Sequence, residues 1–224
     1  MRKLLLTSLL IIVMVASLFV LTACGNKEEG GETPKGAAKI KTTEVSTEYG
    51  RYSVKFTVPV KTDEEGNEVP AYEFVEEVPE AVENIAGEST FLVGEKVVVG
   101  IESNIYTYQT GVDYKKEHGE IEPSFDSFKE FVFSEKSSST LKKGEIVQIG
   151  DREAIKADVR IGNGSGDLYG YRYVVNVDDI TPKSYMTVSY YVPDGNFEST
   201  EATFADAEVQ TIINSLIVEA AAEE

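Results

Sequence analysis

The strongest constraint on the fold is the alternation of apolar and polar residues between residues 145 and 192. A period of two is typical of strands that bury one face, and short turns between successive strands favour antiparallel pairing. The turns are expected at 162–167 and 178–182. The pattern therefore predicts an antiparallel meander of three or four strands with one solvent-exposed face. Its apolar positions are Ile155, Ala157, Val159, Ile161, Tyr169, Tyr171, Tyr173, Val175, Val177, Met186, Val188, Tyr190 and Val192.

Strands are also expected in the first half of the chain. Residues 52–58 alternate in the same way, with Pro59 at the end of the run. Residues 91–93 and 96–101 are continuous apolar runs, as in strands that are buried on both faces. A polar loop is expected between them at 61–70.

Three segments predict helices. Pro79 suits the first turn of a short helix over 79–86, and Ser124 suits the N-cap of a helix over 124–133. Thr203 is the expected N-cap of a closing helix, because apolar residues from 205 to 216 recur at helical spacing. We expect this helix to pack across the sheet.

The N-terminal residues have the layout of a secretory signal. Arg2 and Lys3 precede an apolar run over 4–21, which ends in the sequence LTAC, and Cys24 is the only cysteine of the chain. LTAC resembles the lipobox of bacterial lipoproteins, in which the thiol receives a diacylglyceryl group and the chain is cut just before it. The resemblance implies cleavage between Ala23 and Cys24 and a lipid anchor on Cys24. The alternatives are an uncleaved membrane span, for which the run is long enough, and a cleaved chain with a free thiol.

This resemblance also sets the expected domain organisation and location. Residues 1–23 are the predicted lipoprotein signal peptide, and 24–44, rich in Gly, Lys, Glu and Thr, the predicted lipidated flexible tether. Residues 45–220 are predicted to fold as one domain, with a frayed tail over 221–224. The predicted location is the bacterial cell membrane, with the domain lipid-anchored and facing outside the cytoplasm.

The pattern of elements predicts the α+β class and resembles the PsbP-like group, which includes Mog-like and DcrB-like domains. The resemblance rests on YSVKFTVP from Tyr52, GDREA from Gly150, the YVVNV and MTVSYYV strands, and TIINSL from Thr211. It implies an α/β/α sandwich with a largely antiparallel central sheet and a C-terminal helix packed across it. Members of this group are mostly non-enzymatic subunits or binding partners, and a fold alone does not assign a function.

Charge argues against nucleic acid as a partner. The formal net charge is −18, and loss of the first 23 residues takes it to −20. Phosphate binding requires clustered Lys and Arg, whereas acidic residues outnumber basic ones by 39 to 21 in this chain.

Few residues suggest catalysis or transition-metal binding. Ser165 does not fit the Gly-x-Ser-x-Gly pattern of a nucleophile elbow, because Asn163 and Asp167 occupy the glycine positions. His118 is the only histidine, so a hydrolase would have to use it as its base. One histidine and one lipidated cysteine also disfavour zinc or iron. We therefore predict that the chain is not an enzyme.

Calcium needs only oxygen ligands, which leaves two acidic segments as candidates. The first is the loop that contains Asp63, Glu65, Asn67 and Glu68, and the second is Asp178–Asp179. Neither has the spacing of an EF-hand. A solvated acidic loop is the alternative interpretation.

Tyrosines are a further candidate for binding, because the ring packs while the hydroxyl forms hydrogen bonds. They line either a groove for a sugar or peptide, or the core. The set comprises Tyr106, Tyr108, Tyr114, Tyr169, Tyr171, Tyr173, Tyr185, Tyr190 and Tyr191.

These observations favour a membrane-anchored lipoprotein that serves as a non-enzymatic binding or accessory module for envelope proteins. The alternative is a surface receptor for a small ligand or calcium.

Overall fold

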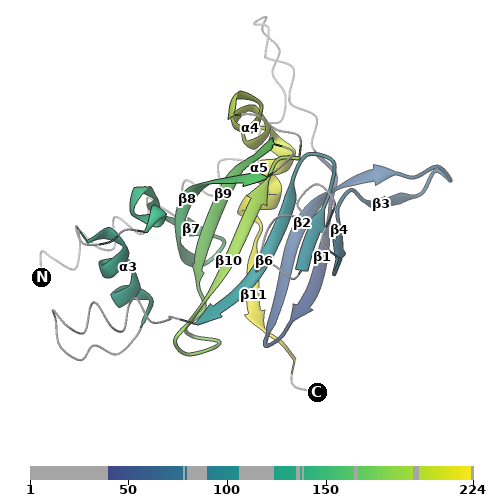
Figure 1. Cartoon of the computed structure of the whole chain (residues 1–224). Coiled ribbons are helices and arrows are strands. Elements are labelled where there is room, and N and C mark those ends of the chain that lie inside the picture. The colour runs from purple at the N-terminus through teal and green to yellow at the C-terminus, as the bar shows by residue number, and fades with distance from the viewer. Residues whose placement is uncertain are drawn as a thin grey trace, which may run out of the picture. The chain divides into compact units, whose positions relative to one another are not determined.

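The computed structural model of the chain describes residues 40–77, 79, 90–105, 124–134, 137, 139–163, 166–193 and 197–222. These residues form two antiparallel sheets, one of seven strands (the large sheet) and one of four (the small sheet) (Figure 1). The large sheet has the order β4-β5-β6-β10-β9-β8-β7. Its strands are β4 (Glu73–Val75), β5 (Thr90–Val93), β6 (Val98–Ile105), β7 (Glu145–Ile149), β8 (Arg152–Asn163), β9 (Gly166–Asn176) and β10 (Ser184–Tyr191).

The predicted meander is confirmed. β7, β8, β9 and β10 pair in sequence and all antiparallel, and β6 lies on the free side of β10. Both faces of this sheet are covered in part, so the expected single solvent-exposed face is wrong. Val174 and Ile155, on the face away from the main core, are buried under a helix.

The small sheet is built around β2 (Tyr52–Thr62). β1 (Thr42–Tyr49) and β11 (Ile217–Ala220) flank it, and β3 (Glu68–Pro70) pairs with its far end. β1 begins three residues before the expected domain start at 45. β2 and β3 form a hairpin where we expected a loop over 61–70.

The main core lies between the two sheets and α5 (Ala207–Asn214). Val54 and Phe56 of β2 contribute to it from the small sheet, and Val188 of β10 from the large sheet. From α5 come Val209, Ile212 and Ile213. The closing helix therefore packs into the core, as its helical spacing predicted.

The expected start of that helix is wrong. Thr203 lies inside a separate helix, α4 (Phe197–Phe204), and the N-cap of α5 is Asp206. The Asp206 carboxylate accepts a hydrogen bond from the backbone N–H of Glu208 at 2.9 Å and binds Lys96 Nζ at 3.0 Å. Because Asp206 satisfies the first orphan donor of α5, the helix begins anew there.

The segment after α5 forms strand β11, whose Val218 is buried against β2 while Ile217 faces outward. The tail predicted over 221–224 is partly tied down, since the backbone N–H of Ala221 donates to the carbonyl of Arg51 at 2.9 Å.

Helix α3 (Phe125–Phe133) covers the other face of the large sheet. Ser124 is its N-cap, as predicted, and Ser127 completes a reciprocal capping box. Phe125 and Val132 of α3 pack on Ile155 and Val174. A short 3₁₀ helix, η2 (Thr140–Lys143), follows.

None of the helices in the described ranges combines the length and apolar character needed to cross a bilayer. Several expectations lie outside the described residues: the segment 1–39 with Ala23 and Cys24, the body of the helix at 79–86, Tyr106, Tyr108, Tyr114, His118 and Ser165.

Candidate functional site

The tyrosines of β9 run from the core out to the surface. Tyr173 is 6% exposed and meets Tyr190 edge-on, with ring centroids 5.5 Å apart. Its burial raises the pKa of Tyr173 to about 12. Tyr171 and Tyr169, two and four residues back along the same face, are only half-buried and line a pocket. The stripe therefore belongs to the core at one end and forms the wall of a pocket at the other.

The register between β8 and β9 brings charge to this face. Asp158 is the cross-strand partner of Tyr171, and Arg160 is the partner of Tyr169. Directly opposed residues of an antiparallel pair project to the same side. The polar face of β8 thus shares a side with the tyrosine face of β9, whereas the apolar face of β8 points to α3.

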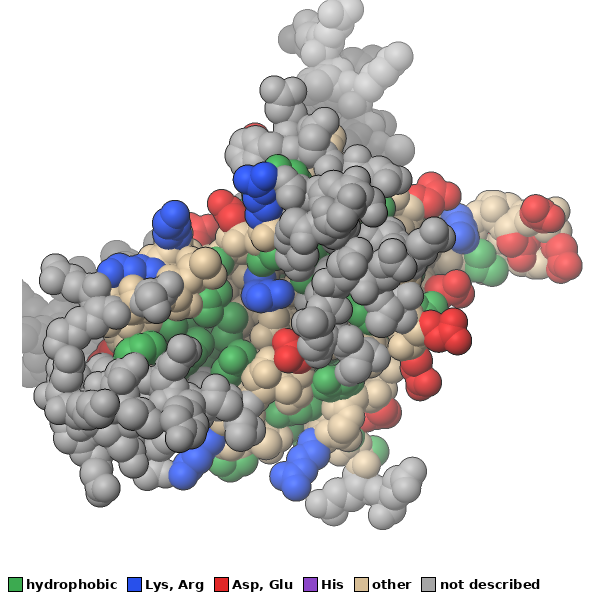
Figure 2. Space-filling model, in the orientation of Figure 1, with side chains coloured by type: hydrophobic (Ala, Val, Ile, Leu, Met, Phe, Trp, Pro, Cys, Tyr) green, Lys and Arg blue, Asp and Glu red, His purple; other side chains and the backbone are tan. Residues whose placement is uncertain are grey.

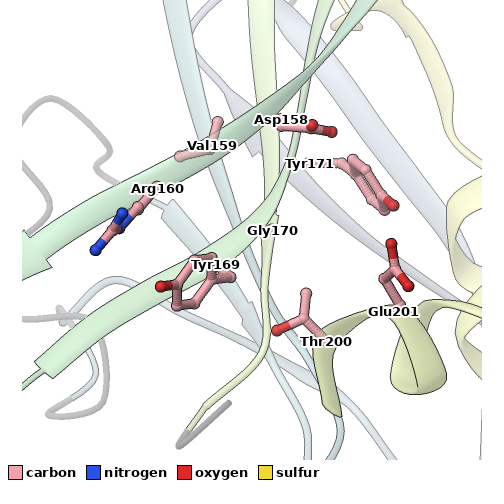
Figure 3. Close-up of a pocket in the computed structure, with 8 residues that line it drawn as sticks. All are labelled: Asp158, Val159, Arg160, Tyr169, Gly170, Tyr171, Thr200 and Glu201. Atoms are coloured by element: carbon pink, nitrogen blue, oxygen red, sulfur yellow. The ribbon is translucent and has the colours of Figure 1, made fainter. Parts of the chain in front are cut away.

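Helix α4 closes the third side of the pocket with Thr200 and Glu201 (Figure 3). It is held there by Phe204, whose ring centroid lies 4.5 Å from that of Tyr171. The pocket has a volume of about 310 Å³, within the range of small-molecule sites. Asp158, Val159, Arg160, Tyr169, Gly170, Tyr171, Thr200 and Glu201 line it.

Two cations of the chain lie over the tyrosine rings. Lys156 Nζ is 4.3 Å from the Tyr171 ring centroid and 3.6 Å from Glu145 Oε1. The Arg160 guanidinium is 5.5 Å from the Tyr169 ring centroid. Both distances are typical of cation–π contacts.

Carboxylates dominate the Tyr171 end of the pocket. Burial raises the pKa of Tyr171, and the nearby charges of Asp158 and Glu201 raise it further. Neither carboxylate forms an ion pair within the described part of the chain. Figure 3 shows them on either side of Tyr171. This end of the pocket therefore combines two carboxylates that have no ion pair in the described ranges with the ammonium group of Lys156 over the Tyr171 ring.

The Thr200 hydroxyl is an unusual feature of the wall. Thr200 is 6% exposed, and its Oγ1 has no hydrogen-bond partner among the described residues. A buried hydroxyl without a partner costs about 1–3 kcal/mol. Less than 1 Å² of this oxygen is accessible, so it is enclosed in the wall and a ligand in the pocket does not reach it.

The predicted calcium loop lies at the tip of the β2–β3 hairpin. Asp63 Oδ1 accepts hydrogen bonds from the backbone N–H groups of Glu65 at 3.0 Å and Asn67 at 2.7 Å. Led by the bond from Asn67, these lower the pKa of Asp63. Glu68 pairs with Lys41. Asp63 thus organises the turn, and no group of three or more His, Cys, Asp or Glu suited to a metal occurs in the described residues.

The second acidic segment, Asp178–Asp179, also forms hydrogen bonds and an ion pair that stabilise the fold. Asp178 accepts hydrogen bonds from the N–H groups of Phe125 at 2.8 Å and Ser184 at 3.2 Å. Asp179 binds Arg152 through both of its oxygens.

Acidic side chains also gather along the edge of the small sheet and at the hairpin tip (Figure 2). Exposed members include Glu44 and Glu48 of β1 and Glu64 and Glu65 of the turn. Solvation accounts for such a surface without a ligand.

The remaining described tyrosines serve packing. Tyr190 and Tyr191 are fully buried, on opposite faces of the sheet, and Tyr185 stacks on Phe128 at 5.2 Å.

Sequence reasoning selected Tyr169 and Tyr171 but missed Asp158, Thr200 and Glu201. The signal for Asp158 was the polar face of β8, whose side of the sheet depends on a register that the sequence does not display. Thr200 and Glu201 lie in α4, which was not predicted because the sequence analysis expected a single closing helix that begins at Thr203.

No family model matches the chain, and no curated protein matches it. The structure is similar to the solution structure of cyanobacterial PsbP (CyanoP) from Synechocystis sp. PCC 6803. That likeness has a TM-score of 0.40 and 11% identity over 89% of this chain and 99% of that one. It is also similar to a crystal structure from Bacteroides thetaiotaomicron VPI-5482, with a TM-score of 0.38 and 12% identity over 76% of this chain. The match spans 46% of the Bacteroides chain, and neither likeness identifies a family or a function.

Proposed function

We propose that this chain is a membrane-anchored bacterial lipoprotein that acts outside the cytoplasm as a non-enzymatic binding or accessory module for envelope proteins. The anchor is a lipid on Cys24, after cleavage that follows Ala23. The LTAC sequence behind a basic tip and an apolar run supports this part of the proposal. Two acyl chains make such anchoring stable.

The observation that carries the binding role is the pocket between β8, β9 and α4. It combines two aromatic walls with two carboxylates that have no ion pairs within the described ranges. Convergent polar groups in a concave site with aromatic walls are typical of ligand recognition. Tyr169 and Tyr171 suit it, since tyrosine offers a large contact area with a polar tip.

We also propose the finer fold assignment, a PsbP-like α/β/α sandwich. The antiparallel large sheet, with α5 on one face and α3 on the other, supports it.

The anchoring and the partner are tested together in intact cells. Labelling with an alkyne fatty acid should mark the native chain and not a Cys24→Ser form. Chemical crosslinking should then enrich one envelope protein with the native chain, and Tyr169→Ala should reduce that enrichment. Equal labelling of both forms would refute the anchor, and an absence of enrichment would refute the accessory role.

A small-ligand receptor is the second candidate, favoured by the pocket volume of about 310 Å³. Calcium at Asp63, Glu65, Asn67 and Glu68 is tested separately, by titrating Ca²⁺ against the native chain and Asp63→Asn. A ligand at 100 times its dissociation constant stabilises a fold by about 2.7 kcal/mol, which thermal unfolding detects.

A further inference from the structure

Strand β7 is the last strand at one end of the large sheet, and among the described strands it pairs only with β8 (Figure 1). Ile149 and Arg152 close the turn between the two strands. Opposed residues of an antiparallel pair alternate between hydrogen-bonded and non-hydrogen-bonded pairs, and the pair that closes a two-residue turn is hydrogen-bonded. The backbone N–H and C=O groups of Ile146 and Gln148 therefore point away from β8, and they form no hydrogen bond within the described part of the chain.

Ile146 makes this edge apolar as well as unpaired. Its side chain is 52% exposed, more than that of any other large hydrophobic residue in the described ranges. It is the cross-strand partner of Ile155, on the face of the large sheet that α3 covers. The apolar surface beneath α3 thus continues to the edge of the sheet, where it ends in an uncovered isoleucine.

The other described strands at the sheet edges carry features that disfavour pairing with a further strand. β1 presents the exposed carboxylates of Glu44 and Glu48, and β4 has only three residues. On β11, the Arg152 guanidinium occupies a backbone carbonyl oxygen. Charge, shortness and cover are common protections of a sheet edge. In β7, by contrast, the one charged residue is Glu145, whose Oε1 lies 3.6 Å from Lys156 Nζ of the same chain.

The edge of β7 is complementary to a second copy of itself. When two β7 strands pair antiparallel about a twofold axis at Val147, Ile146 of each copy opposes Gln148 of the other. The N–H and C=O groups that point outward from these residues then satisfy one another in both copies. The two Ile146 side chains become diagonal neighbours on one face of the sheet, which brings them within contact range and shields them from water.

The charges at the two ends of β7 match this arrangement. Lys142 and Lys143, both exposed, precede the strand, and Asp151 is exposed in the turn that follows it. Because the twofold axis reverses the strand direction, the lysines of each copy lie at the same end as the aspartate of the other. This attraction opposes the repulsion between two chains of net charge −18.

We propose that two copies of the chain associate through β7, so that their large sheets form one continuous antiparallel sheet. Such an association is isologous, since the same surface serves both copies, and this is the commonest symmetry of soluble oligomers. The proposal does not depend on the pocket between β8, β9 and α4, and it goes beyond the proposed function.

Sedimentation equilibrium of the full chain measures the association, in a detergent whose density the buffer matches so that the micelle adds no buoyant mass. The native chain should have twice the mass of one copy. Ile146→Lys places a charge in the paired edge and should weaken the association by about tenfold or more. Ile217→Lys is the same change at the exposed isoleucine of β11 and should leave the association unchanged.

Three results would overturn the proposal. They are a monomeric native chain, an Ile146→Lys variant that associates as the native chain does, and equal weakening by the two variants. Two lipid anchors that share a micelle by chance would affect both variants alike, so the difference between the variants reports the β7 edge.

A cysteine crosslink tests the register and the identity of the occupant. Val147→Cys places two thiols at the twofold axis as a directly opposed, non-hydrogen-bonded pair, whose Cα separation suits a disulfide. Mild oxidation of intact cells should link this variant into a dimer, whereas Ser46→Cys, exposed on β1, should remain monomeric. Both variants keep Cys24. A crosslink from Val147→Cys to a different protein, without the dimer, would overturn the second copy as the occupant and assign the edge to a partner's strand.

Discussion

Arg152 of β8 donates a hydrogen bond from Nε to the carbonyl oxygen of Val218 in β11, at 2.9 Å, and so joins the two sheets. Its Nη1 also donates to the carbonyl of Asn176 at 3.0 Å, and its fork binds Asp179 at 2.6 and 3.1 Å. The Arg152 side chain is only 13% exposed. A planar guanidinium can satisfy these acceptors together, whereas an ammonium cannot.

Replacing Arg152 with Lys should therefore lower the free energy of unfolding by about 2 kcal/mol, measured by urea denaturation. Arg51→Lys changes an exposed residue of the β1–β2 turn and should stay within about 0.5 kcal/mol of the native chain. If both variants are equally stable, the guanidinium does not join the sheets energetically.

Asp179 gives this contact a pH dependence. The hydrogen bond and the charge of Arg152 lower the pKa of Asp179 from its usual 3.8. The folded state thus favours the charged carboxylate, so its contribution is present above pH 3.8 and is lost as the pH falls through the folded pKa.

Asp179→Asn should accordingly be less stable than the native chain at neutral pH, and the gap should close in acid. Since the carboxylate is 66% exposed, we expect a gap below about 1 kcal/mol. Urea denaturation between pH 7 and pH 2.5 measures it, with Asp151→Asn as the control for net charge. A gap that persists at pH 2.5 would contradict the ionic origin.

Gly170 permits a close approach of β9 and β10 at the pocket. A Cβ at this position would stand 1.8 Å from the carbonyl oxygen of Tyr190. Gly170→Ala should force the strands apart and cost about 2–3 kcal/mol. Gly66→Ala meets open space but a φ of +88°, and should cost only about 1 kcal/mol. Equal thermal shifts in the two variants would argue against the steric explanation.

The capping box of α3 predicts a smaller effect. The Ser127 N–H donates to Ser124 Oγ at 3.2 Å, and the Ser124 N–H donates to Ser127 Oγ at 2.9 Å. Ser127→Ala should lower the free energy of unfolding by about 1 kcal/mol in chemical denaturation. Ser46→Ala, exposed on β1, should leave it unchanged. An unaffected Ser127→Ala would show that the Ser127 hydroxyl adds nothing to the caps from Ser124 and Asp178.

Local patterns predicted the parts of this fold that depend on neighbouring residues. The alternation of β8, β9 and β10 gave their strands, and Ser124 gave the start of α3, because period and capping are properties of a short segment. β1 was missed because Thr43 and Thr47 alternate with Val45 and Tyr49 on its inner face, which weakens the apolar signal.

The pocket could not be predicted from local patterns, because it depends on contacts between segments that are far apart in the sequence. The tyrosines were visible as a stripe, but the register that aligns Asp158 with Tyr171 is set by pairing and turn geometry. The break between α4 and α5 depends on Asp206 and its contact with Lys96, more than a hundred residues away. The N-terminal anchor remains a prediction from sequence.

The small sheet also constrains the order in which the chain can fold. β2 pairs with β11 on one side, where Lys55 contacts Glu219 at a sequence separation of 164 residues. Until that segment has been synthesised, the edge of β2 offers unpaired backbone groups to any passing strand. Contacts of such sequence separation form late and slowly. The edge of β2 therefore stays open to incorrect strand pairing until the C-terminal strand β11 pairs with it.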